Sequence, residues 1–138
     1  MRKLALLVSG ATVVAVACVT THITRLHPEM TYPKICPEGV AIFTSAEKAD
    51  TPYVEVAVLS STGSQNYTNQ AQMYESQRKK AAEAGANGLI LGETREASTG
   101  AVVANALIGT PADRRGRAVA IYIERDSARV RQACAGRH

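Results

Sequence analysis

Large aromatic side chains are almost missing from this chain of 138 residues, which has no tryptophan, one phenylalanine and five tyrosines. Few rings are therefore present to fill a core or to stack on nucleic-acid bases. Alanine and valine are common instead, so we expect one small domain with a light core.

A strong excess of one charge is also absent. The chain has 16 basic and 12 acidic residues, and Arg2 and Lys3 belong to the amino-terminal segment, so the remainder has 14 basic residues and a net charge of +2. This balance does not favour a nucleic-acid partner.

Groups for nucleophilic or metal chemistry are few. The histidines are His22, His27 and His138, all near the chain ends, and neither a nucleophile elbow nor a phosphate-binding loop occurs. Glu93 and Glu124 are the nearest approach to a catalytic carboxylate pair, and we interpret them as exposed rim residues. The histidines lack the closely spaced ligand set of a zinc site. We therefore predict no enzyme activity, no metal site and no cofactor.

The amino terminus has the plan of a secretory signal peptide. Residues 1–17 combine a basic start with an apolar stretch, and that stretch is too short for a comfortable membrane span. Together with Cys18 the segment resembles the lipobox of bacterial lipoproteins, which implies cleavage before Cys18 and attachment of acyl chains such as palmitate to it. An ordinary signal peptidase is the alternative, because Ala-Val-Ala at residues 15–17 fits its A-x-A rule.

The number of cysteines favours the lipoprotein alternative. Three cysteines leave an odd one in an oxidising compartment, and acylation of Cys18 removes it. Cys36 and Cys134 then remain as a pair for a disulfide. By the sorting rule of Gram-negative lipoproteins, Val19 after the modified cysteine implies the outer membrane, with the domain facing the periplasm. A secreted soluble protein with a buried or free thiol at Cys18 stays open.

These observations divide the chain into four parts. Residues 1–17 are the predicted signal peptide, and residues 18–38, which lack clean periodicity, are a lipid-anchored tether. Residues 39–134 form a small α/β domain with a loop at 94–117. Residues 135–138 are a short tail.

The centre of the domain is a predicted helix that begins after Asn69. Asn69 and Gln72 have the spacing of a capping box, and Gly85 offers the left-handed residue that ends a helix. One face of the helix collects Met73, Tyr74, Gln77, Ala81 and Ala84. The apolar run at residues 89–91 then predicts a buried strand.

Three other segments predict strands, at residues 40–43, 53–59 and 117–123. In the second of these, valines alternate with other residues, and we expect Val54, Val56 and Val58 to face the helix. The predicted fold class is α+β: a small single domain with the order β-β-α-β-β and one helix packed on a three- to four-stranded sheet.

Two features of the domain stay open. Residues 100–109 fit a short helix, a hairpin arm or a mobile loop. The sheet face opposite the helix is expected to carry Phe43, Tyr53, Ala57, Leu59 and Tyr122. If that face is bare, it is the candidate surface for binding another envelope protein; if residues 100–109 cover it, it is core. Exposed strand edges also favour a homo-oligomer.

The last part of the chain is rich in arginine. A phosphate-rich surface such as lipopolysaccharide or an anionic lipid is one partner for these guanidiniums. The interpretation we favour is a solvated charged rim, because no aromatic platform accompanies them. The residues are Arg114, Arg115, Arg117, Arg125, Arg129, Arg131 and Arg137.

Part of the chain resembles two kinds of bacterial protein. In this part a helix ends in A-x-x-x-G-A-N, an apolar strand follows, and the last strand reads R-A-V-A-I-x-I. The pattern rests on Arg78, Lys79, Ala81, Ala82, Gly85, Ala86 and Asn87. It resembles the outer-membrane lipoprotein that senses envelope stress for the Rcs phosphorelay, and the YbjQ-type domain often described as heavy-metal-binding. The first resemblance implies a non-enzymatic envelope lipoprotein that binds or senses another envelope component. A metal-binding domain and a secreted domain of unknown activity are the alternatives.

Overall fold

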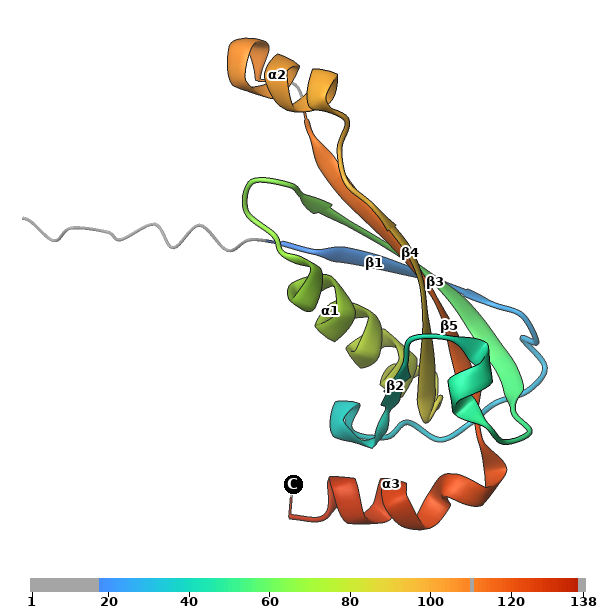
Figure 1. Ribbon diagram of the computed structural model, residues 1–138. Helices are drawn as coiled ribbons and strands as arrows, with labels where there is room; N and C mark the ends of the chain where they lie inside the picture. Colours follow the sequence, from blue (N-terminus) through green and yellow to red (C-terminus); the bar gives the residue numbers. More distant parts are fainter. Residues whose placement is uncertain (1–17, 110, 137–138) are drawn as a thin grey trace, which may run out of the picture.

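Five strands of the described residues form one sheet in the computed structural model (Figure 1). The structure describes residues 18–109 and 111–136, so the predicted signal peptide and His138 lie outside it. The strands are β1 (Thr20–Arg25), β2 (Ala41–Phe43), β3 (Val54–Ser64), β4 (Gly88–Arg95) and β5 (Asp113–Tyr122). Their order across the sheet is β1-β3-β5-β4-β2, with β2 parallel to β4 and the other neighbours antiparallel. The class is α+β, as predicted.

Three helices surround the sheet at different places. They are α1 (Gln70–Glu83), α2 (Thr99–Ile108) and α3 (Ser127–Cys134), with short 3-10 turns η1 (Pro37–Gly39), η2 (Ala46–Ala49) and η3 (Glu124–Asp126). Helix α1 lies against one face of the sheet, α3 crosses its lower end, and α2 stands beyond its upper end (Figure 1). Residues 100–109, left open by the sequence, are therefore mostly helical.

The ends of α1 follow the predicted signals. Asn69 and Gln72 form a reciprocal capping box, in which each side chain accepts a hydrogen bond from the other residue's backbone N–H at 2.8 Å. Gly85 has a φ of 80° and follows the last turn. Met73, Gln77, Ala81 and Ala84 are all buried. Tyr74, expected on the same face, is only half-buried. The sequence therefore predicted the limits of α1 and four of the five residues expected on its inner face.

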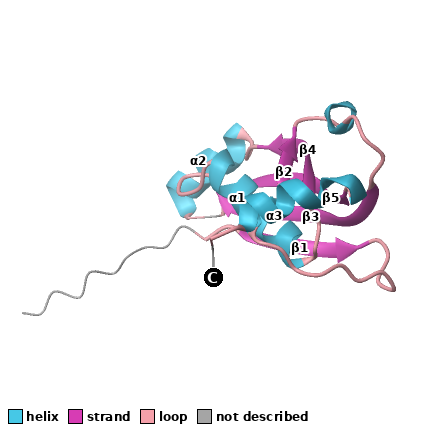
Figure 2. Ribbon diagram, turned by 90° about the horizontal axis from the view of Figure 1, so that it is seen from below, coloured by secondary structure: helices cyan, strands magenta, loops and turns pink. Residues whose placement is uncertain are grey.

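Strand β1 corrects the predicted tether at residues 18–38. Thr20 to Arg25 pair with β3, so the sheet has five strands instead of three or four (Figure 2). The Thr21 hydroxyl also lies 3.1 Å from that of Ser61 and 2.7 Å from that of Ser76. Five of the six β1 residues are exposed, so the segment lacks the apolar alternation by which strands are recognised.

The orientation predicted for β3 is right for Val56, which is buried in the core under α1, and wrong for Val54. An irregularity in the pairing of β3 with β5 lies between Glu55 and Ala57, and such a bulge shifts the residues that follow it to the other face. Ala57 and Leu59 consequently join the core under α1, whereas Val54 is exposed.

Two apolar clusters cover opposite faces of the sheet. The larger lies under α1, where Ala118 and Ala120 of β5 meet Ala81 and Ala82 of the helix. These small side chains let the helix approach the sheet closely. On the other face, η2 and its flanking residues cover only the lower part, around Ala49, Ile121 and Ile123. The upper part of this second face is left open.

The predicted Cys36–Cys134 disulfide is present, with the two Cα atoms 5.7 Å apart. It joins the segment before η1 to the last residue of α3. Arg129 of α3 donates hydrogen bonds to the backbone carbonyls of Gly39 at 2.9 Å and Asn87 at 3.1 Å. The carboxyl-terminal helix is therefore fixed to the lower end of the domain by a covalent bond and by the hydrogen bonds of the partly exposed Arg129.

Candidate functional site

The five residues of the candidate binding surface do not form one exposed patch. Ala57 is fully buried in the core under α1. Leu59 is fully buried under α1, and Tyr122 packs on the same cluster, where its ring stacks on Tyr32 with centroids 4.3 Å apart. Phe43 and Tyr53 pack on the cluster of the opposite face. The expected patch is therefore divided between two cores, and the segment that covers the second face is η2 and its flanks rather than α2.

The arginines are likewise separated by the fold. Arg114 donates to the Thr68 carbonyl at 3.0 Å and pairs with Glu96 at 3.0 Å, and Arg129 pairs with Asp126, so both have structural partners. Arg125 and Arg131 lie at the α3 end of the molecule, and Arg137 lies outside the described residues. Only Arg115 and Arg117 remain together on the open face.

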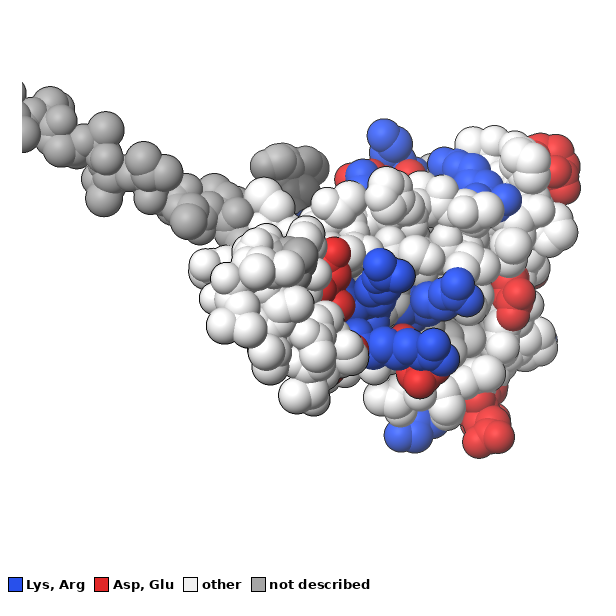
Figure 3. All heavy atoms as spheres, turned by 90° about the horizontal axis from the view of Figure 1, so that it is seen from above, with Lys and Arg blue, Asp and Glu red and all other residues white. Residues whose placement is uncertain are grey.

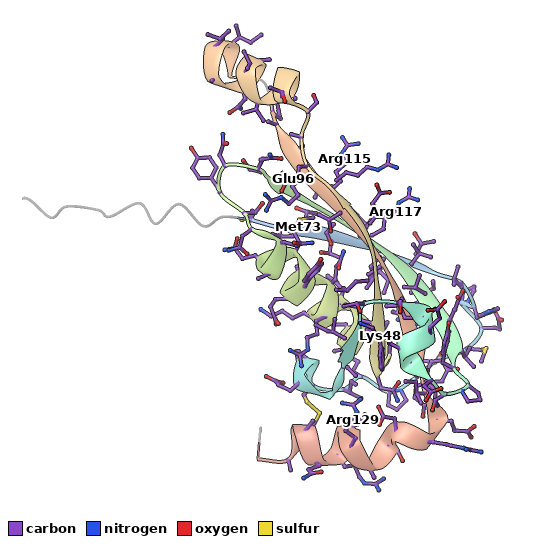
Figure 4. The ribbon with its side chains drawn as sticks, viewed as in Figure 1. Lys48, Met73, Glu96, Arg115, Arg117 and Arg129 are labelled. Atoms are coloured by element: carbon purple, nitrogen blue, oxygen red, sulfur yellow. A yellow bond between two sulfur atoms is a disulfide. The ribbon has the colours of Figure 1, made fainter. Side chains whose placement is uncertain are left out.

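Strand alternation places Arg115 and Arg117 on the face opposite α1. Gly116 between them faces the helix, since a Cβ there would lie 3.2 Å from the Met73 Cε and 3.5 Å from the Gln77 Nε2. Figure 4 shows the two arginines on the side of β5 away from Met73. Arg95 of β4 is in register with Arg115, and neighbouring positions of paired strands share a face.

These side chains line a groove of about 310 Å³. Glu93, Arg95, Arg115, Gly116 and Arg117 form its walls, and basic side chains gather there beside an uncharged surface when the molecule is seen from above (Figure 3). Glu93 pairs with Arg95 at 3.1 Å. Within the described residues no ion pair involves Arg115 or Arg117. The groove therefore presents two uncompensated guanidiniums to solvent.

The sheet register extends this surface toward β1. Ser60 is opposite Arg117, Thr62 is opposite Arg115, and His22 of β1 is opposite Ser60. Side chains that are directly opposite lie about 5 Å apart on one face. Hydroxyl and imidazole donors therefore continue the row of guanidiniums, and the whole arrangement suits an anion with several oxygen atoms.

Sequence reasoning found Arg115 and Arg117 but missed Arg95. The signal was present as charged residues alternating at Glu93 and Arg95 after the apolar strand. The apolar run that predicts this strand stops at residue 91, whereas β4 continues to Arg95. Its outer half is polar because no layer covers it.

Neither a metal cluster nor a membrane-spanning helix occurs within residues 18–109 and 111–136. No group of three His, Cys, Asp or Glu residues there could hold a metal ion, and no helix is long and apolar enough to cross a membrane. His22 and His27 are both exposed, and His27 lies 3.5 Å from Glu29.

Comparison with known proteins gives one informative likeness of fold. No protein-family model and no curated protein sequence matches the chain. A similar solved structure is that of the Francisella virulence factor FvfA in its orthorhombic crystal form, with a TM-score of 0.53 and 12% sequence identity. The match covers 74% of this chain and 96% of that one. At this identity the likeness shows the fold alone.

Proposed function

We propose that the protein is a non-enzymatic, lipid-anchored component of the bacterial cell envelope that binds an anionic, phosphate-bearing envelope molecule through the arginine groove. The observation that carries the proposal is the pair of exposed, uncompensated guanidiniums of Arg115 and Arg117 beside Arg95. Guanidiniums bind phosphate through paired, charge-assisted hydrogen bonds. The role agrees with the binding or sensing function implied by the resemblance to the Rcs stress-sensor lipoprotein.

The proposed anchor is acylation of Cys18. It would hold the domain at the outer membrane, on the side that faces the periplasm. Cys18 is exposed and outside the disulfide, so its thiol is accessible for modification. The non-reduced mass of the protein extracted from its host membranes tests the anchor. A chain that begins at Cys18 and carries acyl mass supports it, whereas a chain that begins there without acyl mass indicates the secreted alternative.

Ligand binding is tested on residues 18–138 with Cys18→Ser, because the five strands, both apolar clusters and the disulfide lie within the described part of that segment. The probe is delipidated, phosphorylated core oligosaccharide from lipopolysaccharide, titrated calorimetrically. Replacing Arg115 and Arg117 by glutamine removes two charge-assisted contacts and is expected to weaken binding at least about tenfold.

The matched control replaces Arg125 and Arg131, which are exposed at the far end of the molecule, by glutamine. It changes the net charge by the same amount and is expected to leave affinity within about twofold, since distant surface charges are screened by salt. Equal loss in both double variants would mean that general charge, and not the groove, attracts the ligand.

A further inference from the structure

Helix α2 belongs to a segment with no charge and an apolar surface. Residues 97–112 contain no Asp, Glu, Lys or Arg. Every residue of α2 is described, and none is buried. Val103, Leu107 and Ile108 are 50%, 78% and 75% exposed. Isolated exposed apolar residues are ordinary, but a contiguous group on a projecting helix marks a surface that contacts another apolar phase.

The helix is held in this projecting position by the loop between β3 and α1. Gln65 donates its backbone N–H to the Ala112 carbonyl at 2.9 Å, and its side chain accepts from the Ala97 N–H at 2.6 Å. Asn66 donates to Asn105 at 2.9 Å. Tyr67 of the same loop is 72% exposed. The four most exposed large apolar side chains of the described residues are therefore gathered at one end of the domain.

Cys18 lies at this same end. One row of the sheet contains Thr20, Thr62, Arg115 and Arg95 in register, and α2 begins four residues after Arg95. Cys18 precedes Thr20 by two residues, which span at most about 7 Å. A lipid on Cys18 therefore brings the upper end of the sheet, and α2 with it, against the membrane surface.

We propose that α2 is a second membrane contact, which inserts Val103, Leu107 and Ile108 into the phospholipid surface that holds the acyl group of Cys18. The inference rests on the proposed lipid anchorage. Ten residues of helix are about 15 Å long, half the hydrocarbon thickness, so α2 lies in the interface and does not cross it. Arg95 and Arg115, at the base of α2, face the negative headgroups.

The absence of tryptophan from the chain permits a direct test. In residues 18–138 with Cys18→Ser, Leu107→Trp introduces the only indole. Vesicles of equal parts phosphatidylethanolamine and phosphatidylglycerol are expected to shift its emission to shorter wavelength, and brominated acyl chains to quench it. The control is Ile42→Trp, at the exposed position of β2 at the lower end, whose emission is expected to stay unchanged.

A second measurement keeps the test independent of the reporter. Leu107→Ser combined with Ile108→Ser is expected to reduce the vesicle-bound fraction in flotation about tenfold or more, because two apolar side chains no longer leave water. Ile42→Ser combined with Val54→Ser removes two apolar side chains that are 40% and 39% exposed elsewhere on the domain, and it is expected to have no effect.

Two results overturn the inference. One is L107W emission that vesicles do not change. The other is a combination of two observations: the protein with unmodified α2 does not bind vesicles, and it forms a dimer in sedimentation velocity that the Leu107→Ser, Ile108→Ser variant does not form. That combination would assign α2 to the contact with a second copy of the chain. Failure of the proposed function can be distinguished from failure of this inference. Acylation is measured by the mass of the protein and oligosaccharide binding by the groove variants, and neither measurement depends on α2.

Discussion

Asn87 connects the end of α1 to the last residues of β5 and the start of η3. Its side chain is 3% exposed and makes two hydrogen bonds of 2.7 Å, donating to the Ile123 carbonyl and accepting from the Ile123 N–H. The sequence singled out Asn87 only as the last residue of the A-x-x-x-G-A-N pattern. The amide in fact satisfies both backbone groups of a buried residue.

Asn87→Ala is expected to lower the free energy of unfolding by about 2 to 4 kcal/mol, because it leaves a buried N–H and a buried C=O without partners. Urea unfolding of the oxidised protein measures the change. Asn66→Ala, which removes an exposed side-chain hydrogen bond, is the control and is expected to cost less than about 0.5 kcal/mol. Similar costs at the two positions would contradict this role for Asn87.

At the scale of elements, the end of α1 depends on one glycine. Gly85 is in the left-handed region, and a Cβ there would lie 2.4 Å from the Tyr32 Cβ and 2.6 Å from the Tyr32 carbonyl oxygen. The segment that leads from β1 to η1 therefore crosses the helix end at van der Waals contact. The positive φ was readable from the sequence, but this approach of a segment 53 residues earlier was not.

Gly85→Ala is expected to destabilise the protein by at least about 2 kcal/mol, since it combines left-handed strain with displacement of Tyr32 from its stack on Tyr122. Gly100→Ala is the matched control. Gly100 lies inside α2 with nothing within 4 Å of the added Cβ, so alanine is expected to be neutral or to stabilise by about 0.5 to 1 kcal/mol. Thermal unfolding compares the two, and equal destabilisation would show that the close approach at Gly85 does not matter.

At the scale of the whole molecule, covalent and polar contacts at the lower end are separated from the proposed membrane contacts at the upper end. The disulfide joins residues 98 apart in sequence, and Arg129 bonds to the carbonyls of Gly39 and Asn87 beside it. Strand β3, with eleven residues, extends about 36 Å along the sheet between these two ends. The lower end therefore stands away from the membrane in the proposed orientation.

Removal of the disulfide by Cys36→Ala with Cys134→Ala is expected to lower the free energy of unfolding by about 4 to 5 kcal/mol, because a loop of this length greatly restricts the unfolded chain. Urea unfolding at one pH and temperature gives the difference. Cys18→Ala, which changes an exposed thiol outside the disulfide, is expected to leave the transition unchanged. An unchanged midpoint and slope in the double variant would contradict the prediction.

The sequence by itself determined the features that depend on neighbouring residues. The capping box of α1, the left-handed Gly85, the α+β class and the buried strands follow from spacing and local chemistry. The disulfide partners followed from the number of cysteines. Each of these rests on an interaction between residues close in sequence, or on a count, so no knowledge of the third dimension was needed.

Only the tertiary structure decided how separated segments meet. It paired the polar strand β1 with β3, because backbone hydrogen bonds to a neighbour stabilise a strand that has no apolar pattern. It shifted Leu59 into the core through a bulge, and it brought Arg95 beside Arg115 and Arg117 through the register of β4 with β5. It also placed α2 at the same end of the sheet as the start of β1, which lies two residues after Cys18. Register and pairing are properties of two chain segments at once, which is why one segment's sequence cannot specify them.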